Sequence, residues 1–229
     1  MRHASLDRAL FPGGRTLLPW EQGIVVKVRD AAGFVLGVVF GGGCVFGWLS
    51  YKHSSGPFRG DQGALPDRNP RWAQRMASAH LRNFYKVSDD LYRGAQPDRQ
   101  GFLELETLGV RTVVNLRLGG SDKAMLQGTS LTPVEIPAEA WDLDDKDVEA
   151  FLRVVTDKSR TPVFVHCSHG ADRTGAMTAF YRIVVQGWSK QDAIAEMTTG
   201  GFGFHSLWEN LPSTIRSADV GRLKAATVR

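Results

Sequence analysis

Short apolar runs alternate with helical patterns across residues 80–220. Runs rich in β-branched and aromatic residues predict strands over 110–117, 132–137 and 161–165. Apolar side chains at three- and four-residue spacing predict helices over 98–108, 146–152, 174–185, 190–197 and 206–217. Strands that alternate with helices are typical of an α/β domain, so we predict a mainly parallel central sheet flanked by helices. This span is long enough to bury one core.

One predicted strand carries apolar side chains on both faces. Alternation along 110–117 assigns Val110, Val114 and Leu116 to one face and Val113 to the other. Apolar groups on both faces are typical of a central strand that helices cover on each side.

A long uncharged segment precedes this domain. Residues 31–51 carry no charge over 21 positions, enough at about 1.5 Å per residue to cross a hydrocarbon core of about 30 Å. We therefore predict a single transmembrane helix over 31–51, the alternative being a core helix weakened by its six glycines. The expected organisation is a tail (1–30), this helix, a flexible stalk rich in Gly, Pro, Ser and Arg (52–79), the domain (80–220) and a C-terminal tail (221–229).

The uncharged segment also carries glycines at four-residue spacing, at Gly33, Gly37 and Gly41. Small residues so spaced let two membrane helices approach closely, which predicts a homodimer through this helix. The chain is thus expected to be a single-pass membrane protein. Basic residues are nearly balanced on the two sides of residues 31–51, so the sequence leaves the side of the domain open.

The strongest chemical signal is a loop between a predicted strand and a predicted helix, Val165 to Gly175, which reads VHCSHGADRTG. A helix N-terminus presents unpaired N–H groups and the positive end of the helix dipole, so such a loop binds anions. Arg173 adds a planar fork that suits two phosphate oxygens. The same positive field favours the thiolate form of Cys167, which opens the loop and would face a bound phosphoryl group as a nucleophile.

This loop resembles the signature loop of the cysteine-dependent protein tyrosine and dual-specificity phosphatase superfamily and is similar to that of an atypical bacterial dual-specificity-like member. The resemblance implies that Cys167 attacks phosphorus to form a phosphocysteine and that Arg173 holds phosphate oxygens through the transition state. It also implies that Thr174 hydrogen-bonds the sulfur and that His166 orients the loop from behind. The rest of the phosphate loop is then formed by Ser168, His169, Gly170, Ala171 and Asp172.

Two further features bear on this resemblance. Some lipid-active bacterial phosphatases carry a lysine where this chain has Ala171, which weakens an assignment to phosphoinositides. The segment from Leu91 to Pro97 resembles the Leu-Tyr-Arg-x-x-Gln-Pro entry strand of atypical dual-specificity and plant-and-fungi phosphatases. Arg93 and Gln96 would then line the substrate edge, the alternative being a capped turn before a helix.

The proton donor is the least determined part of the predicted site. The superfamily places an aspartate about 30 residues before the cysteine, where this chain lacks the Trp-Pro-Asp triplet of the large tyrosine phosphatases. Of Asp144 and Asp145, one is expected to cap the helix that follows. Asp142 is therefore our first candidate for the general acid, followed by Glu139 and then Asp172.

Net charge and residue spacing exclude some of the remaining classes of function. A net charge of +4 with dispersed basic residues does not indicate nucleic acid. The sequence shows no metal-ligand spacing, and the mechanism requires no metal or other cofactor. The function predicted is a membrane-anchored phosphomonoester hydrolase that acts on phosphorylated proteins or small phosphomonoesters. An inositol phosphate or phosphoinositide phosphatase is the alternative enzyme, and a non-catalytic phosphate-binding module is the alternative of another class.

Overall fold

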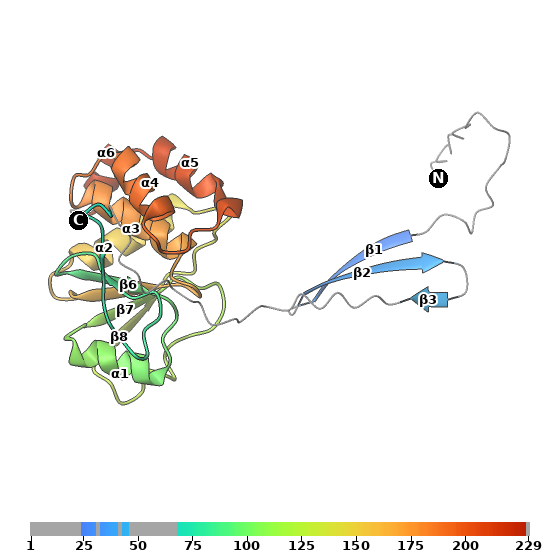
Figure 1. The fold of residues 1–229 in the computed structure, drawn as a ribbon, viewed down its shortest axis with the longest axis horizontal. Coiled ribbons are helices and arrows are strands. Elements are labelled where there is room, and N and C mark those ends of the chain that lie inside the picture. The colour runs from blue at the N-terminus through green and yellow to red at the C-terminus, as the bar shows by residue number, and fades with distance from the viewer. Residues whose placement is uncertain (1–23, 31–32, 41–42, 46–67, 228–229) are drawn as a thin grey trace, which may run out of the picture. The chain divides into compact units, whose positions relative to one another are not determined.

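The chain divides into two compact units, Met1–Arg59 and Gly60–Arg229, which we treat separately (Figure 1). The computed structural model describes residues 68–227 with their side chains. Of the first unit it describes only the backbone of 24–30, 33–40 and 43–45.

A six-stranded sheet with the order β4-β5-β6-β9-β7-β8 forms the middle of the second unit (Figure 1). Its strands are β4 (Gln74–Arg75), β5 (Tyr85–Lys86), β6 (Leu91–Gly94), β7 (Thr112–Asn115), β8 (Thr132–Glu135) and β9 (Val163–His166). The β6-β9, β9-β7 and β7-β8 pairs are parallel, whereas β4-β5 and β5-β6 are antiparallel. The sheet is therefore mixed and not mainly parallel throughout. The sequence pattern did not predict the antiparallel strands β4 and β5 at its edge.

Helices cover both faces of the sheet (Figure 1). One face packs against α1 (Arg99–Thr107), and the other lies beneath the layer of α2 (Asp145–Thr156), α3 (Asp172–Val184), α4 (Lys190–Thr199), α5 (Asn210–Ser217) and α6 (Val220–Thr227). Val113 and Phe164 belong to the core on the α1 side, while Val114 and Val165 belong to the core beneath the other helices. The prediction of a strand covered on both faces is confirmed. Val110 was assigned to the wrong face, because it precedes β7, where strand alternation does not apply.

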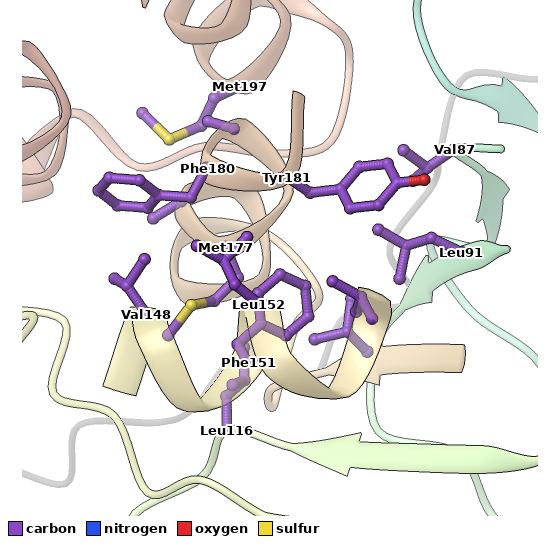
Figure 2. Close-up of a cluster of buried hydrophobic side chains, with 14 of the residues drawn as sticks. Val87, Leu91, Leu116, Val148, Phe151, Leu152, Met177, Phe180, Tyr181 and Met197 are labelled. Atoms are coloured by element: carbon purple, nitrogen blue, oxygen red, sulfur yellow. The ribbon is translucent and has the colours of Figure 1, made fainter. Parts of the chain in front are cut away.

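The larger core surrounds α3, which is buried along most of its length (Figure 2). Met177 and Phe180 of α3 lie in one cluster with Phe151 and Leu152 of α2, all at most 1% exposed. Truncating a buried phenylalanine such as Phe151 to alanine costs about 3–5 kcal/mol, so these contacts hold α3 firmly. The N-terminus of α3 is thereby fixed relative to the sheet, which matters because the signature loop leads directly into it.

The domain begins earlier and ends later than the sequence indicated. Glu196, buried in an ion pair with Arg182, accepts the backbone N–H of Ala73 at 2.6 Å. The final part of the predicted stalk therefore belongs to the domain. The predicted tail at 221–229 is also corrected, since Val220–Thr227 form α6, whose Leu223 is fully buried.

The predicted helix over 31–51 is not found in the segments that the structure describes. Backbone at β1 (Ile24–Asp30), β2 (Gly33–Phe40) and β3 (Gly43–Val45) forms an antiparallel sheet. Valine and phenylalanine favour strands and glycine weakens helices, which accounts for this outcome. Residues 31–32, 41–42 and 46–51 of the predicted helix, the tail up to 23 and most of the stalk lie outside the described residues. Among the residues described, the structure contains no helix of sufficient length and apolarity to cross a membrane.

Candidate active site

The signature loop leaves the sheet at the carboxyl end of its parallel strands. β9 lies between β6 and β7, and its last residue, His166, pairs with Gly94 and Asn115 at the ends of those two strands. Ligands bind at this edge in open α/β sheets. The loop then runs from Cys167 to Ala171, and α3 begins at Asp172 without a side-chain hydrogen bond from its N-cap. Its first amides therefore receive no hydrogen bond from the N-cap side chain, the arrangement that anion binding at a helix N-terminus requires.

Close packing fixes the shape of the loop. Gly170 has φ +69°, and a Cβ there would lie 2.3 Å from the carbonyl carbon of Gly94. Only glycine fits both the backbone conformation and this approach. On the other side, Asn83 donates to the carbonyl oxygen of His169 at 2.9 Å. The loop is therefore braced against β6 and the segment before it.

Arg173 and Thr174 lie in the first turn of α3, and Cys167 lies in the loop that leads into it. Cys167 is a free thiol that is only 3% exposed. The half-buried Arg173 donates through Nη1 to the carbonyl oxygens of Leu116 at 3.2 Å and Ala138 at 3.5 Å. These bonds leave Nη2 and Nε available to a ligand. The hydroxyl of Thr174 is fully buried and has no hydrogen-bond partner within the described structure, which is an unusual and costly state for a polar group.

His166 lies beneath the loop in a buried polar network. Its Nε2 is 2.8 Å from Oδ2 of Asp122, and its Nδ1 is 3.3 Å from the carbonyl oxygen of Cys167. Oδ1 of Asp122 accepts hydrogen bonds from Gln96 at 3.0 Å and Arg117 at 3.2 Å. Burial alone raises the pKa of Asp122, but the hydrogen bond and charge of His166, with Gln96 and Arg117, outweigh it and lower that pKa. The carboxylate is therefore held ionised.

Arg93 lies in the interior and not at the substrate edge. It is fully buried, donates to the carbonyl oxygen of Gly170 at 2.7 Å, and packs over the ring of Phe202 at 3.9 Å. Burial lowers its pKa to about 10, still far above neutrality, so the side chain is a cation. The sequence alone suggested a substrate contact because it could not show that β6 turns this side chain under the loop.

The acid candidates differ in their surroundings. Asp142 is exposed in the segment after β8, four residues beyond the Ala138 carbonyl that Arg173 contacts. Glu139 is half-buried. The pKa of the neighbouring Asp147 is raised, first by burial and then by the negative charges of Asp144 and Glu139. Asp144 is the N-cap of α2, so one of the two predicted capping acids does cap the helix.

Asp172, the third candidate, is 8% exposed and binds His205. His205 comes from the glycine-rich segment before the short 3₁₀ helix Ser206–Trp208, and its ring lies 6.0 Å from that of His169. Among the described residues, no group of three or more histidine, cysteine or carboxylate side chains is placed to hold a metal ion.

Sequence reasoning did not single out Asp122. Its signal was present, however, because Asp122 follows a predicted strand at the same edge of the sheet as the signature loop. A polar residue shortly after a buried parallel strand is a candidate for the site at that edge.

Comparison with known proteins places this arrangement in a family. Residues 73–211 match the family model described as DSP-PTPase phosphatase fused to NAD+ kinase. The dual specificity protein phosphatase TpbA of Pseudomonas aeruginosa (strain UCBPP-PA14) is 40% identical over 172 residues, which span 75% of this chain and 77% of TpbA. The chain belongs to the dual-specificity protein phosphatase family. It is thus an enzyme of the cysteine-dependent tyrosine and dual-specificity class.

Solved structures agree with this assignment. The crystal structure of P. aeruginosa TpbA superposes on the phosphatase with a TM-score of 0.64 at 39% identity, covering 71% of this chain and 99% of that one. A cysteine-to-serine variant of TpbA in complex with pTyr superposes with a TM-score of 0.63 at 38% identity, covering 71% and 99%. The catalytic domain of the PP-IP phosphatase SIW14 from S. cerevisiae shares the fold, with a TM-score of 0.59 at 19% identity over 66% of this chain and 94% of that one.

Proposed function

We propose that this phosphatase hydrolyses phosphomonoesters on proteins through a phosphocysteine intermediate. The observation that carries the proposal is the presence of a thiol, a guanidinium and a buried unpaired hydroxyl within the first turn of one helix and the loop before it. A module that only bound phosphate would not require the thiol or this hydroxyl. Retention of all three groups therefore favours catalysis over the binding module.

The first step transfers the phosphoryl group to sulfur. The thiolate of Cys167 forms an S–P bond as the P–O bond to the leaving group breaks, and the electron pair of that bond goes to the leaving oxygen. Arg173 offers Nη2 and Nε to the equatorial oxygens, since its Nη1 is held by two carbonyl groups. The loop amides and the N-terminus of α3 stabilise the same charge.

The second step returns the enzyme to its starting state. A water molecule passes a proton to the general acid that protonated the leaving group and forms a new P–O bond. The S–P bond breaks, and inorganic phosphate leaves while Cys167 regains its thiolate. Thr174 would donate its hydroxyl hydrogen to the sulfur as negative charge returns there. This role gives the buried hydroxyl a hydrogen-bond partner, which it lacks within the described structure.

Asp142 is our proposal for the proton donor to the leaving group. It lies in the segment that Arg173 contacts through Ala138, and its exposed side chain is free to meet a substrate. Asp144 is committed to capping α2 and Asp145 to an ion pair with Arg222. The remaining loop residues, Ser168, His169, Gly170, Ala171 and Asp172, would contribute the backbone cradle.

Phosphorylated protein is the substrate class that the comparisons favour. TpbA is a dual specificity protein phosphatase, and its solved complex holds pTyr. Inositol phosphates remain the second candidate, because inositol diphosphatase DSP5 of Arabidopsis thaliana is 28% identical over 129 residues, spanning 50% of this chain and 59% of that protein. Ala171 at the position of the lipid-phosphatase lysine weakens the lipid alternative.

Membrane anchoring through residues 31–51 rests on their uncharged sequence, and dimerisation rests on their glycine spacing. Both remain predictions from the sequence. Fractionation of cells that express the full chain, with and without residues 1–59, tests the first. Full-length protein in the soluble fraction would contradict it.

The catalytic proposal is tested by assaying the full chain on an aryl phosphate in the presence of a chelator. We expect turnover by the wild type and none by the Cys167→Ser variant. Turnover that survives this substitution would refute the thiol mechanism. Parallel assays on phosphotyrosyl and phosphoseryl peptides, inositol phosphates and phosphoinositide vesicles then rank the substrate classes by kcat/KM.

A further inference from the structure

A buried aspartate outside the signature loop is connected to the nucleophile through a single histidine. Asp122 follows β7 and is 1% exposed, and its Oδ2 lies 2.8 Å from Nε2 of His166. The other ring nitrogen of His166 lies 3.3 Å from the carbonyl oxygen of Cys167. The path from the carboxylate to the nucleophilic residue therefore consists of one imidazole ring.

The partners of this ring indicate which of its nitrogens carry hydrogen. A carboxylate oxygen and a carbonyl oxygen can only accept hydrogen bonds. Both ring nitrogens of His166 face such acceptors, so both must carry hydrogen for the network to be complete. The ring is fully buried between Phe102 and Phe164, where an unpaired polar atom would be costly. The doubly protonated imidazolium satisfies every contact of the ring.

Asp122 supplies the charge that makes such a cation stable. A buried imidazolium is unfavourable without a partner, because burial removes the water that would solvate it. Asp122 provides a negative charge in direct contact, and its second oxygen is fixed by Gln96 and Arg117. These donors come from the ends of β6 and β7, so the carboxylate is oriented from two neighbouring strands.

We propose that Asp122 is a positioning residue that holds His166 as an imidazolium beneath the signature loop, so that Cys167 is kept as a thiolate and the loop keeps its shape. The proposal rests on the proposed role of Cys167 as nucleophile and extends it to a residue outside the loop. Asp122 acts through His166 and does not touch the substrate.

Other charged groups near Cys167 also affect the charge of its thiol. The buried cation Arg93 of β6 interacts electrostatically with Cys167 from below, and Arg173 lies on the first turn of α3. Asp122 pairs with His166 through one carboxylate oxygen and with Arg117 through the other. Removing the charge of Asp122 leaves both Arg93 and Arg173 in place, so we expect a partial loss of thiolate and not a complete one.

The test measures thiol reactivity directly and needs no substrate turnover. The full chain is alkylated with iodoacetamide at pH 6 and pH 8, and modification is followed on the Cys167 peptide by mass spectrometry so that Cys44 does not contribute. We expect similar rates at the two pH values in the wild type. In Asp122→Asn the ratio of the rate at pH 6 to that at pH 8 should fall about tenfold. This is the loss of thiolate that one pH unit below the pKa of a thiol produces. In His166→Asn the ratio should fall similarly, and the double variant should fall no further than either.

Glu196→Gln is the matched control. It also replaces a buried carboxylate in an ion pair, with Arg182, but it does not contact His166. We expect it to destabilise the fold without lowering the alkylation ratio. An unchanged ratio in Asp122→Asn, or an equal fall in Glu196→Gln, would overturn the proposal and leave Asp122 a purely structural residue.

A second measurement applies even if Asp122→Asn does not fold. The ¹⁵N shifts of the His166 ring in the wild-type protein distinguish the imidazolium from the neutral tautomers. The proposal requires the imidazolium throughout pH 6 to 8, and a neutral ring at pH 7 would overturn it. Because neither readout depends on phosphate hydrolysis, failure of this proposal is distinguishable from failure of the phosphocysteine mechanism.

Discussion

Asp172 at the start of α3 contacts His205 twice: its Oδ1 accepts a hydrogen bond from the backbone N–H of His205 at 2.8 Å, and its Oδ2 lies 2.8 Å from the ring Nδ1. The two contacts fasten the glycine-rich segment before α5 to the end of the signature loop. Because both carboxylate oxygens are engaged by His205, Asp172 is better suited to holding this segment in place than to delivering a proton to a substrate. This geometry favours Asp142 as the acid.

Replacing Asp142 with asparagine should slow turnover most for poor leaving groups. We expect kcat to fall about 10²–10⁴-fold on phenyl phosphate or a phosphotyrosyl peptide, the range of general acid catalysis, and much less on an activated aryl phosphate. The basic limb of the pH–rate profile should also disappear. Asp144→Asn is the control, since asparagine caps a helix as well as aspartate does and should leave activity unchanged. Wild-type leaving-group dependence in Asp142→Asn would transfer the assignment to Glu139 or Asp172.

Arg173→Lys should keep the charge and lose the planar fork. Losing donors aimed at the transition state costs about 10²–10³ in kcat. The exposed Arg111 provides the control, because Arg111→Lys changes the same side chain away from the loop. Steady-state kinetics on an aryl phosphate measures both, and a fall in kcat of less than tenfold in Arg173→Lys would argue that charge alone suffices.

Thr174→Val should separate stability from function. The buried hydroxyl has no partner in the described structure, so its removal should leave the free energy of unfolding unchanged or slightly raised. Hydrolysis of the phosphocysteine should slow, and a burst of leaving group should precede a slower steady state. Stopped-flow kinetics and urea denaturation provide the two measurements. A large loss of stability without a burst would assign Thr174 to the fold.

Gly170→Ala should inactivate the enzyme while the rest of the domain remains folded. A methyl group at φ +69° is strained and would lie 2.3 Å from the backbone of Gly94, so the loop must move. We expect loss of phosphate binding with near-native circular dichroism. Gly109→Ala is a suitable control, because Gly109 also has positive φ, at +81°, but has open space around it. Equal effects of the two variants on activity would remove the argument from close packing.

Asp122 should also contribute to the pH dependence of stability. Its pKa is lowered in the folded state, mainly by His166 against the opposing effect of burial. A depressed carboxyl pKa stabilises the fold above the unfolded value of about 3.9, and this contribution is lost as pH falls through the folded pKa. The stability difference between wild type and Asp122→Asn should therefore be largest near neutral pH and shrink in acid. Urea denaturation at several pH values measures it, and a constant difference would contradict the linkage.

Much of the fold could be predicted from the sequence because its strands and helices have strong local patterns. The strand before Cys167 and the helix after Arg173 are both present, and α4 begins at the start of the predicted helix 190–197. The short strands β4 and β5 carry too few residues to show any period. Helix α6 was missed because one buried side chain, Leu223, leaves little amphipathic pattern.

The candidate site could be predicted only where its residues are adjacent in sequence. Cys167, Arg173 and Thr174 come from one continuous loop and turn, so their spacing alone brings them together. Asp122 and Arg93 reach the loop through sheet pairings that join β6, β7 and β9. The place of Asp122 after a predicted strand hinted at the site, but only the order of the strands shows that either residue lies beside the loop.

Trapping of the phosphorylated enzyme tests the central claim most directly. The full chain is mixed with an aryl phosphate, quenched in acid within milliseconds and digested for mass spectrometry. The account predicts a phosphoryl group on the sulfur of Cys167, absent from Cys167→Ser and accumulating further in Thr174→Val. Burst-phase release of the aryl product without any phosphoryl group on Cys167 would contradict it.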